Sequence, residues 1–230
     1  IVYWVGNKAI EDDALLKDKH SECTHGLVVG LHEFGGDTNG MHWSDSYEFI
    51  LDHWINKEGN PYKDKVNTYE QNKLCGYSNT VAMTDYNKGS GDGIFPSKVK
   101  DNNGYRVLPC VAINEYAGTH ITPTASSGWY FPSGRELSTL CSGWQSAWTD
   151  SGTYGGTDSP GSNIDTVNEK LSALSVSGID AEKVAGAVYW SSSSYRYNEK
   201  IAFMVYMLSG NVNMDRKDLT SNRVRAVLAF

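Results

Sequence analysis

The sequence has no apolar stretch long enough to cross a membrane. A membrane-spanning helix needs about 20 consecutive apolar residues, and no run of even eighteen occurs in this 230-residue chain. We therefore predict a protein that does not span a membrane. The chain begins at Ile1, with neither Met nor a charged-then-apolar leader, so we interpret it as a mature or trimmed fragment whose targeting signal cannot be read.

Positive charge is also scarce. The chain has 20 Lys and Arg against 27 Asp and Glu, which gives a net charge of -7 and an isoelectric point near 5.3. The basic residues are scattered along the sequence, whereas contacts to nucleic-acid phosphates need them clustered. We therefore expect no nucleic-acid partner.

Cysteine is rare, and its spacing excludes the common zinc and redox motifs. Cys23, Cys75, Cys110 and Cys141 lie far apart and form no C-x-x-C pair. Cys141 falls on the apolar stripe of a predicted helix, which favours a buried free thiol there. One disulfide, between Cys75 and Cys110, is left open.

The sequence also lacks catalytic motifs and regular metal-ligand pairs. It has no G-x-S-x-G or H-E-x-x-H motif, and residues 89–93 are not followed by the Lys-Ser/Thr pair of a phosphate loop. Residues 37–40 begin like a calcium loop but lack the later Glu, so we interpret them as a turn. We predict that the protein is not an enzyme and binds no cofactor and no metal. Four residues could be considered as zinc ligands, but their spacing is irregular: His20, Cys23, His25 and His32.

What the chain does have is enough apolar material for a packed core. Apolar residues make up 40% and aromatic residues 12% of the sequence. Short apolar runs at 1–5, 26–31 and 223–230 predict strands, the first two as antiparallel neighbours. We predict one α+β domain over 1–230, with mostly antiparallel strands, two or three helices, and the N- and C-terminal strands paired in one sheet.

Helices are indicated by apolar spacings of three and four. Such spacings predict helices from Ser44 to about Ile55, from Val107 to Ala117 and from about Ile164 to Leu174. The stretch 76–104 is rich in Asn, Ser, Gly, Lys and Asp, and residues 89–93 within it are typical of an exposed loop.

Another helix has the clearest local signature in the chain. Ser133 stands three residues before Glu136, which is the spacing of a capping box. The apolar residues that follow would form one stripe on this helix: Leu137, Leu140, Cys141, Trp144 and Trp148.

The segment 201–222 predicts a hairpin that carries an exposed surface. Residues 201–208 are a strand, 209–211 a turn, and the returning stretch mixes Met, Leu, Arg, Asp and Asn without a period. Alternation along the strand turns Phe203, Val205 and Met207 inward and Met204, Tyr206 and Leu208 outward. The alternative is that another element covers the outward face and makes it core.

Several short motifs resemble bacterial and phage domains of the C-type-lectin-like fold. They are HGLVV at 25–29, GWYFPS at 128–133, YWSSS at 189–193, GNVN at 210–213 and RVRAV at 223–227. The resemblance covers nearly the whole chain and fits least well over 56–104. The calcium-dependent sugar motif of such lectins is absent, so the resemblance does not imply calcium or sugar binding through it.

The C-terminal third more narrowly resembles the variable proteins of diversity-generating retroelements, of the gut Bacteroides or phage type. In that family, adenine-directed mutagenesis rewrites template Asn codons near the end of the gene and leaves a fixed Arg-Val-Arg strand. The resemblance implies a variable ligand-binding segment at about 189–222. Met204 and Met214 depart from the pattern, because a Met codon needs a third-position G.

Within this segment, rigid aromatic and small polar side chains have the composition of a binding surface. Trp129, Trp144, Trp190 and Phe203 would be scaffold. The expected ligand contacts are Tyr195, Arg196, Tyr197, Asn198, Met204, Tyr206, Leu208, Asn211, Asn213, Met214, Asp215, Arg216, Asp218, Leu219 and Ser221.

Together these features predict a receptor-binding or adhesion domain that displays a diversified surface to a protein or glycan on another cell. It would lie outside the cell, at the cell surface or on a phage tail, attached to a longer fibre or lipoprotein stalk. The alternative is a structural tip or stalk subunit of a pilus or tail fibre, without a diversified binding role.

Overall fold

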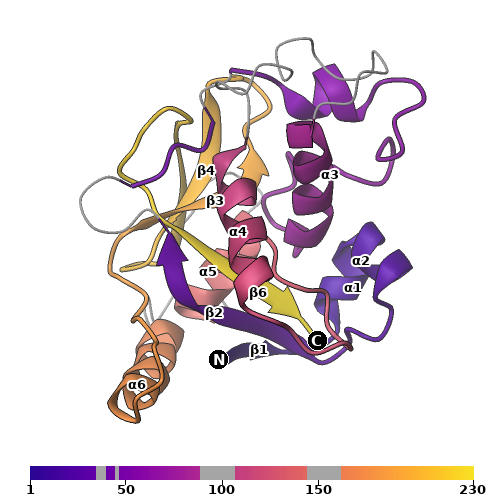
Figure 1. The fold of residues 1–230 in the computed structure, drawn as a ribbon. Coiled ribbons are helices and arrows are strands. Elements are labelled where there is room, and N and C mark those ends of the chain that lie inside the picture. Colours follow the sequence, from indigo (N-terminus) through magenta and orange to yellow (C-terminus); the bar gives the residue numbers. More distant parts are fainter. Residues whose placement is uncertain (35–39, 45–46, 89–106, 144–161) are drawn as a thin grey trace.

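Two small antiparallel sheets and seven helices make up the part of the chain that the structure describes (Figure 1). The structure is a computed structural model, and it describes residues 1–34, 40–44, 47–88, 107–143 and 162–230. This mixed architecture is the α+β class that the sequence predicts. The helices exceed the two or three expected.

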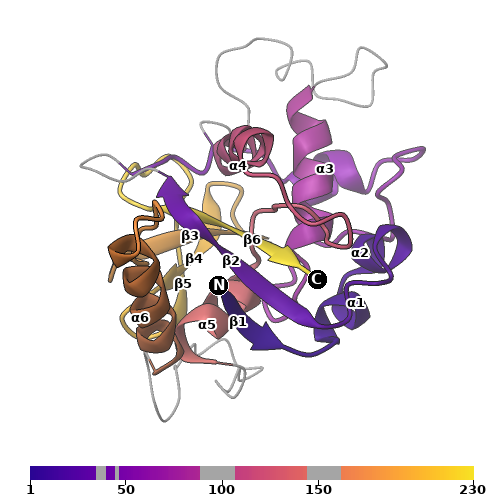
Figure 2. The same cartoon turned by 60° about the horizontal axis from the view of Figure 1, so that its bottom comes forward.

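The first sheet contains both ends of the chain. Its strand order is β1 (Val2–Val5), β2 (Gly26–Phe34), β6 (Val224–Ala229), and both pairings are antiparallel. The terminal strands therefore share one sheet, as predicted. They flank β2 and do not pair with each other, because β2, nine residues long, hydrogen-bonds along both of its edges. The two chain ends lie close together (Figure 2).

The second sheet has the order β3 (Val188–Ser194), β4 (Ile201–Tyr206), β5 (Asn211–Arg216). β4 and β5 form the predicted hairpin, in register from Ile201 opposite Arg216 to Tyr206 opposite Asn211. The two sheets meet where the start of β3 runs beside Arg223, just before β6. The backbone of Trp190 donates to the carbonyl of Arg223, and that of Arg223 to the carbonyl of Val188.

Three of the predicted helices are confirmed. They are α4 (Leu108–Thr119), α5 (Gly134–Ser142) and α6 (Ser162–Val176). The capping box of α5 is present: the backbone of Glu136 donates to Ser133 Oγ at 3.3 Å, and that of Ser133 to Glu136 Oε2 at 2.6 Å. Trp144 and Trp148 lie outside the described residues.

The helix predicted from Ser44 is much shorter in the structure. Only a π-helical turn, η1 (Leu51–Ile55), forms there. Leu51, Trp54 and Ile55 are buried as expected, but Tyr47 is exposed and lies outside any helix. Residue 45 lies outside the described part of the chain.

The largest departure is α3 (Gly76–Lys88), which lies where no helix is predicted. Its buried residues mix apolar side chains, such as Met83 and Tyr86, with polar ones, so the apolar spacing is interrupted. Ser78 and Asn79 are buried because their side chains are hydrogen-bonded, to Asp13 and to Ser192 respectively. Residues 89–106 lie outside the described residues. Two short helices near the N-terminus are also absent from the prediction: α1 (Lys8–Asp12) and α2 (Ala14–Lys19).

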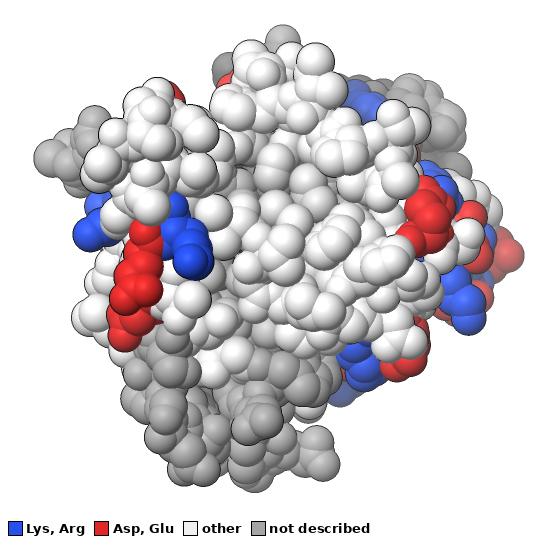
Figure 3. Space-filling model, turned by 90° about the horizontal axis from the view of Figure 1, so that it is seen from below, with Lys and Arg blue, Asp and Glu red and all other residues white. Residues whose placement is uncertain are grey.

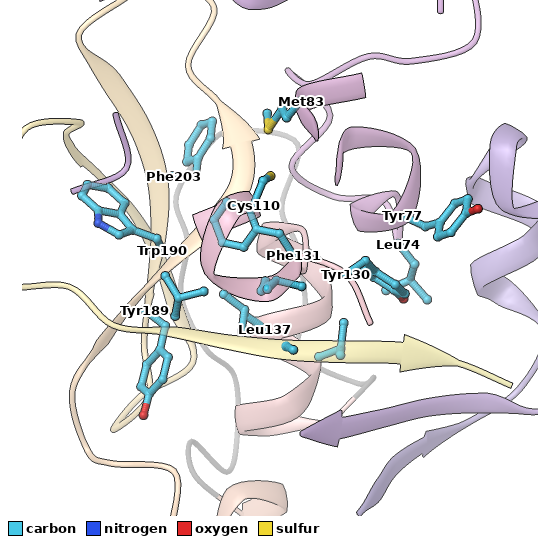
Figure 4. Packing of buried hydrophobic residues seen from close by; sticks show 14 of the residues in the cluster. Leu74, Tyr77, Met83, Cys110, Tyr130, Phe131, Leu137, Tyr189, Trp190 and Phe203 are labelled. Carbon is cyan, nitrogen blue, oxygen red and sulfur yellow. The ribbon is translucent and has the colours of Figure 1, made fainter. Parts of the chain in front are cut away.

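The core lies between the two sheets and helices α3, α4 and α5. Figure 4 shows Tyr189 and Trp190, neighbours on β3, pointing in opposite directions, while Phe203 and Cys110 lie close to the centre. Trp190 is fully buried, and its indole Nε1 donates to the carbonyl of Met41 at 2.6 Å. The predicted scaffold role of Trp190 and Phe203 agrees with this burial; Trp129 is partly buried against the same core.

The cysteines are all buried and free, so the disulfide considered between Cys75 and Cys110 does not form. The burial of Cys141 as a free thiol is confirmed. Burial raises the pKa of the Cys75 and Cys110 thiols above their ordinary value. Both thiols therefore stay protonated near neutral pH, and a protonated buried thiol is a poor nucleophile and metal ligand.

A buried ionic network joins the two sheets. Arg225 on β6 is fully buried and donates to the carbonyls of Gly30, Leu31 and Glu182 at 2.9, 2.7 and 2.6 Å. The Glu33 carboxylate lies 3.8 Å from its guanidinium and also contacts Arg223 and the Tyr189 hydroxyl. Since Tyr189 belongs to β3, this cluster links the two sheets through side-chain contacts.

Candidate ligand-binding surface

The hairpin carries the residues predicted to contact a ligand, and its burial follows the predicted alternation only in part. Phe203, Val205 and Met207 are buried, and Tyr206 and Leu208 are exposed at 39% and 76%. These five agree with the period of two along a strand.

Met204 is the exception, because it is 3% exposed and cannot be part of an accessible surface. It lies opposite Trp190 in the sheet, so the two side chains share one face. Residues 40–44 cover that face: Met41 accepts from the Trp190 indole, and the backbone of Trp43 donates to the carbonyl of Lys217 at 2.8 Å. The prediction that Met204 is displayed is therefore wrong.

The remaining predicted contacts extend over the whole length of the hairpin, from its turn to the far end of β5. Tyr206, Leu208 and Asn211 stand at the turn, whereas Ile201 at the opposite end of β4 pairs with Arg216. Five steps along a strand span about 17 Å. The set therefore has a turn end and a loop end, and Asn213, Met214 and Asp215 lie between them on β5. The loop end carries Tyr195, Arg196, Tyr197, Asn198, Arg216, Asp218, Leu219 and Ser221.

At the loop end, a chain of aromatic rings leads from the core to solvent. The Tyr195 ring lies 5.9 Å from that of Phe203 and 5.5 Å from that of Tyr197, edge to face in both cases. Tyr197 is 74% exposed, and the Arg196 guanidinium lies 5.2 Å from its ring centre. Tyr195 thus supports an exposed aromatic ring on a rigid base, which limits the ordering entropy lost on binding.

A charged cluster lies on the β5 side of the same end. Arg216 makes a two-point contact with Asp218, with Nε at 3.0 Å and Nη2 at 2.6 Å, and Tyr47 donates to Asp218 at 2.5 Å. The hydrogen bond from Arg216 lowers the pKa of the Asp218 carboxyl. The sequence prediction missed Tyr47, because its spacing assigned it to the buried side of a helix. Leu219 and Met214 are half-buried against the core.

Along β5, two side chains bond to the strand's own backbone. Asn213 Oδ1 accepts from the backbone of Met214, and Asp215 Oδ1 from the backbone of Arg216, both at 2.8 Å. The backbone of Lys217 donates to Lys200, on the β4 side. Because alternate residues of an antiparallel pair face the partner strand, the bonded amides of residues 214 and 216 face away from β4.

Lys217 lies between the predicted contacts Arg216 and Asp218 but points inward. It is 2% exposed, its Nζ donates to the carbonyl of Glu48 at 2.9 Å, and it lies 4.6 Å from the Trp43 ring centre. Burial lowers the pKa of Lys217 from 10.5 to about 7. Lys217 therefore anchors the end of β5, and no apolar period marks it in the sequence.

This buried amine should make stability depend on pH. Between pH 7 and 9 the unfolded chain keeps Lys217 protonated while the folded chain releases the proton, so the free energy of unfolding should rise with pH, by at most about 1.4 kcal/mol per pH unit. Lys217→Met should remove that rise, whereas Lys200→Met, at an exposed site, should keep it. Urea unfolding at several pH values measures the free energy of unfolding of each variant. The same pH dependence in wild type and Lys217→Met would contradict the prediction.

The described residues were also compared with the requirements of a metal site and of a membrane-spanning helix. Within the described ranges, no group of three or more His, Cys, Asp or Glu side chains is placed to hold a metal ion. Among the helices that the structure describes, none combines the length and apolar character needed to cross a membrane. The calcium-like stretch includes residues 37–39, which lie outside the described part.

Comparison with known proteins gives a likeness of fold. The chain is similar to the crystal structure of a fimbrial protein from Bacteroides ovatus, with a TM-score of 0.67 and 20% sequence identity. The likeness covers 100% of this chain and 43% of that protein, so this chain spans less than half of its length. No protein-family model matches the sequence, and no curated protein matches it.

Proposed function

We propose that this chain is a domain of a surface-fibre protein, at the tip or in the stalk of a fimbria-like structure outside the cell. The observation that carries this proposal is the fold likeness to a fimbrial protein, which extends over the whole chain. It favours the fibre-subunit alternative of the sequence prediction over a free receptor-binding domain. Fibre assembly, and not catalysis, would be the primary role.

A surface with little charge supports the assembly role. Figure 3 shows the side of the molecule on which β1 and both chain ends lie, and a broad uncharged area there separates two charged margins. β1 displays Val2 and Val5, exposed at 50% and 75%. Exposed apolar side chains within an uncharged area are typical of a protein–protein contact.

The fibre role is tested by fractionation of the cells that encode the protein. Fibres sheared from the surface should contain the chain, detected with an antibody raised against the purified domain. Val5→Lys should reduce its amount in the sheared fraction, because a charge would enter the subunit contact. Leu208→Lys, at an equally exposed site on the hairpin turn, is the matched control and should not. A chain confined to the cytoplasm would contradict the proposal.

A second role, ligand display, is favoured by the supported ring of Tyr197 and the neighbouring Arg196 and Arg216. In this proposal the loop end of the hairpin binds a macromolecule on another cell, and the diversified segment 189–222 of a C-type-lectin-like retroelement protein remains a prediction. A nearby reverse transcriptase gene, with a template repeat that differs from this gene's end only at adenines, is the observation that tests it. Template differences at other bases would contradict it.

A further inference from the structure

A groove opens beside the loop end of the hairpin. It lies between η1, the segment 56–75 and Arg196 of the β3–β4 loop, and it encloses about 840 Å³. This volume is in the range of small-molecule sites, about 300–1,000 Å³. The argument uses these lining residues: Asp52, Asn67, Tyr69, Glu70 and Arg196.

The chemistry of the lining is polar and nearly balanced in charge. Four carboxylates, three cationic side chains and four side-chain amides line the groove. Its large aliphatic residues, Leu51 and Val66, are buried. A strongly charged ligand would meet repulsion as well as attraction here, and a peptide would find neither an apolar pocket nor a strand edge. Hydroxyl groups suit such a lining, because each donates to carboxylates and accepts from amides and guanidinium.

Several of these polar groups are held in place before any ligand arrives. The Tyr69 hydroxyl donates to Asp52 Oδ2 at 2.8 Å, and its backbone N–H donates to Asn67 Oδ1 at 3.1 Å. Asn67 Nδ2 in turn donates to Glu70 Oε1 at 3.4 Å. Burial and the bond to Asp52 raise the pKa of Tyr69, so it stays a hydroxyl donor. Fixed donors and acceptors reduce the entropy lost on binding.

An exposed aromatic residue lies next to one lining residue of the groove. Arg196, which lines it, lies against the ring of Tyr197, and that ring is 74% exposed. A face of this kind packs against the apolar C–H face of a pyranose ring, while the groove binds the hydroxyls. Arg196 connects the groove with the Tyr197 ring, because it lines the groove and contacts the ring.

We propose that this groove binds a neutral saccharide, with Asp52, Asn67 and Arg196 on its hydroxyls and Tyr197 at its rim. The proposal names a ligand class for the display role and rests on it through Arg196 and Tyr197. It is independent of assembly into a fibre.

The test uses the purified chain on a printed array of neutral and sialylated oligosaccharides, followed by calorimetry with the strongest binder. Neutral oligosaccharides should bind, and Asp52→Asn and Arg196→Ala should each weaken binding at least tenfold. Asp165→Asn, an exposed aspartate of α6, is the matched control and should bind as wild type does. Thermal melts of all three variants should match wild type, because each side chain is exposed.

Binding of sialylated glycans alone, no binding to the array, or full affinity in Asp52→Asn would each overturn the proposal. The fibre role fails separately. A chain that binds neutral saccharide but is absent from sheared fibres would remove only the assembly role, and a chain in fibres that binds no saccharide would remove only the groove.

Discussion

Replacement of Trp190 by Ala should lower the free energy of unfolding by about 3–5 kcal/mol. The side chain is fully buried, so its removal leaves a cavity between β3 and residues 40–44. The carbonyl of Met41 would also lose its indole donor. Chemical denaturation of the purified chain measures the change.

Leu208→Ala is the control for that experiment. Leu208 is 76% exposed, and surface substitutions usually change stability by less than about 0.5 kcal/mol. Equal losses of free energy for the two variants would mean that the hairpin turn is part of the core, and Leu208 would have to be withdrawn from the predicted ligand contacts.

Arg225→Met should have a comparable effect, about 3–5 kcal/mol. The substitution removes the donors to three backbone carbonyls and leaves the buried Glu33 carboxylate with less positive charge near it. A buried acceptor that loses its partner keeps the full penalty of desolvation. Thermal and urea unfolding should both report the loss.

Arg223→Met is the matched control, two residues away on the same segment. Its side chain is 30% exposed and contacts the same Glu33 carboxylate. Water can therefore replace part of the contact that the substitution removes. We expect a loss of about 1 kcal/mol. A loss as small as this for Arg225→Met would mean that the buried network contributes little to stability.

The sequence predicted those helices and strands that are determined by residues close together in the chain. The capping box of α5 needs only Ser133 and Glu136, and the terminal strands show as apolar runs. The same holds for the burial of Phe203 and Val205 and the exposure of Tyr206 and Leu208, which follow from alternation along one strand.

The predictions that were wrong or missing depend on contacts between residues far apart in the sequence. α3 was missed because Ser78 and Asn79 are buried by hydrogen bonds to Asp13 and Ser192, far away in the chain. Met204 is covered by residues 40–44, and no pattern near 204 carries that information. The groove likewise combines an irregular stretch at 51–75 with Arg196, and only the fold brings them together.

The bonds along β5 limit which residues positions 213 and 215 can accept. Each side chain accepts a hydrogen bond from a backbone N–H that would otherwise face solvent on the outer edge of the strand. Such an open edge is a template on which a strand from another molecule can add, the first step of aggregation. If these positions vary, Asn, Asp and other short polar residues would keep the two amides bonded, whereas Val or Ile would leave them open to a strand of another molecule.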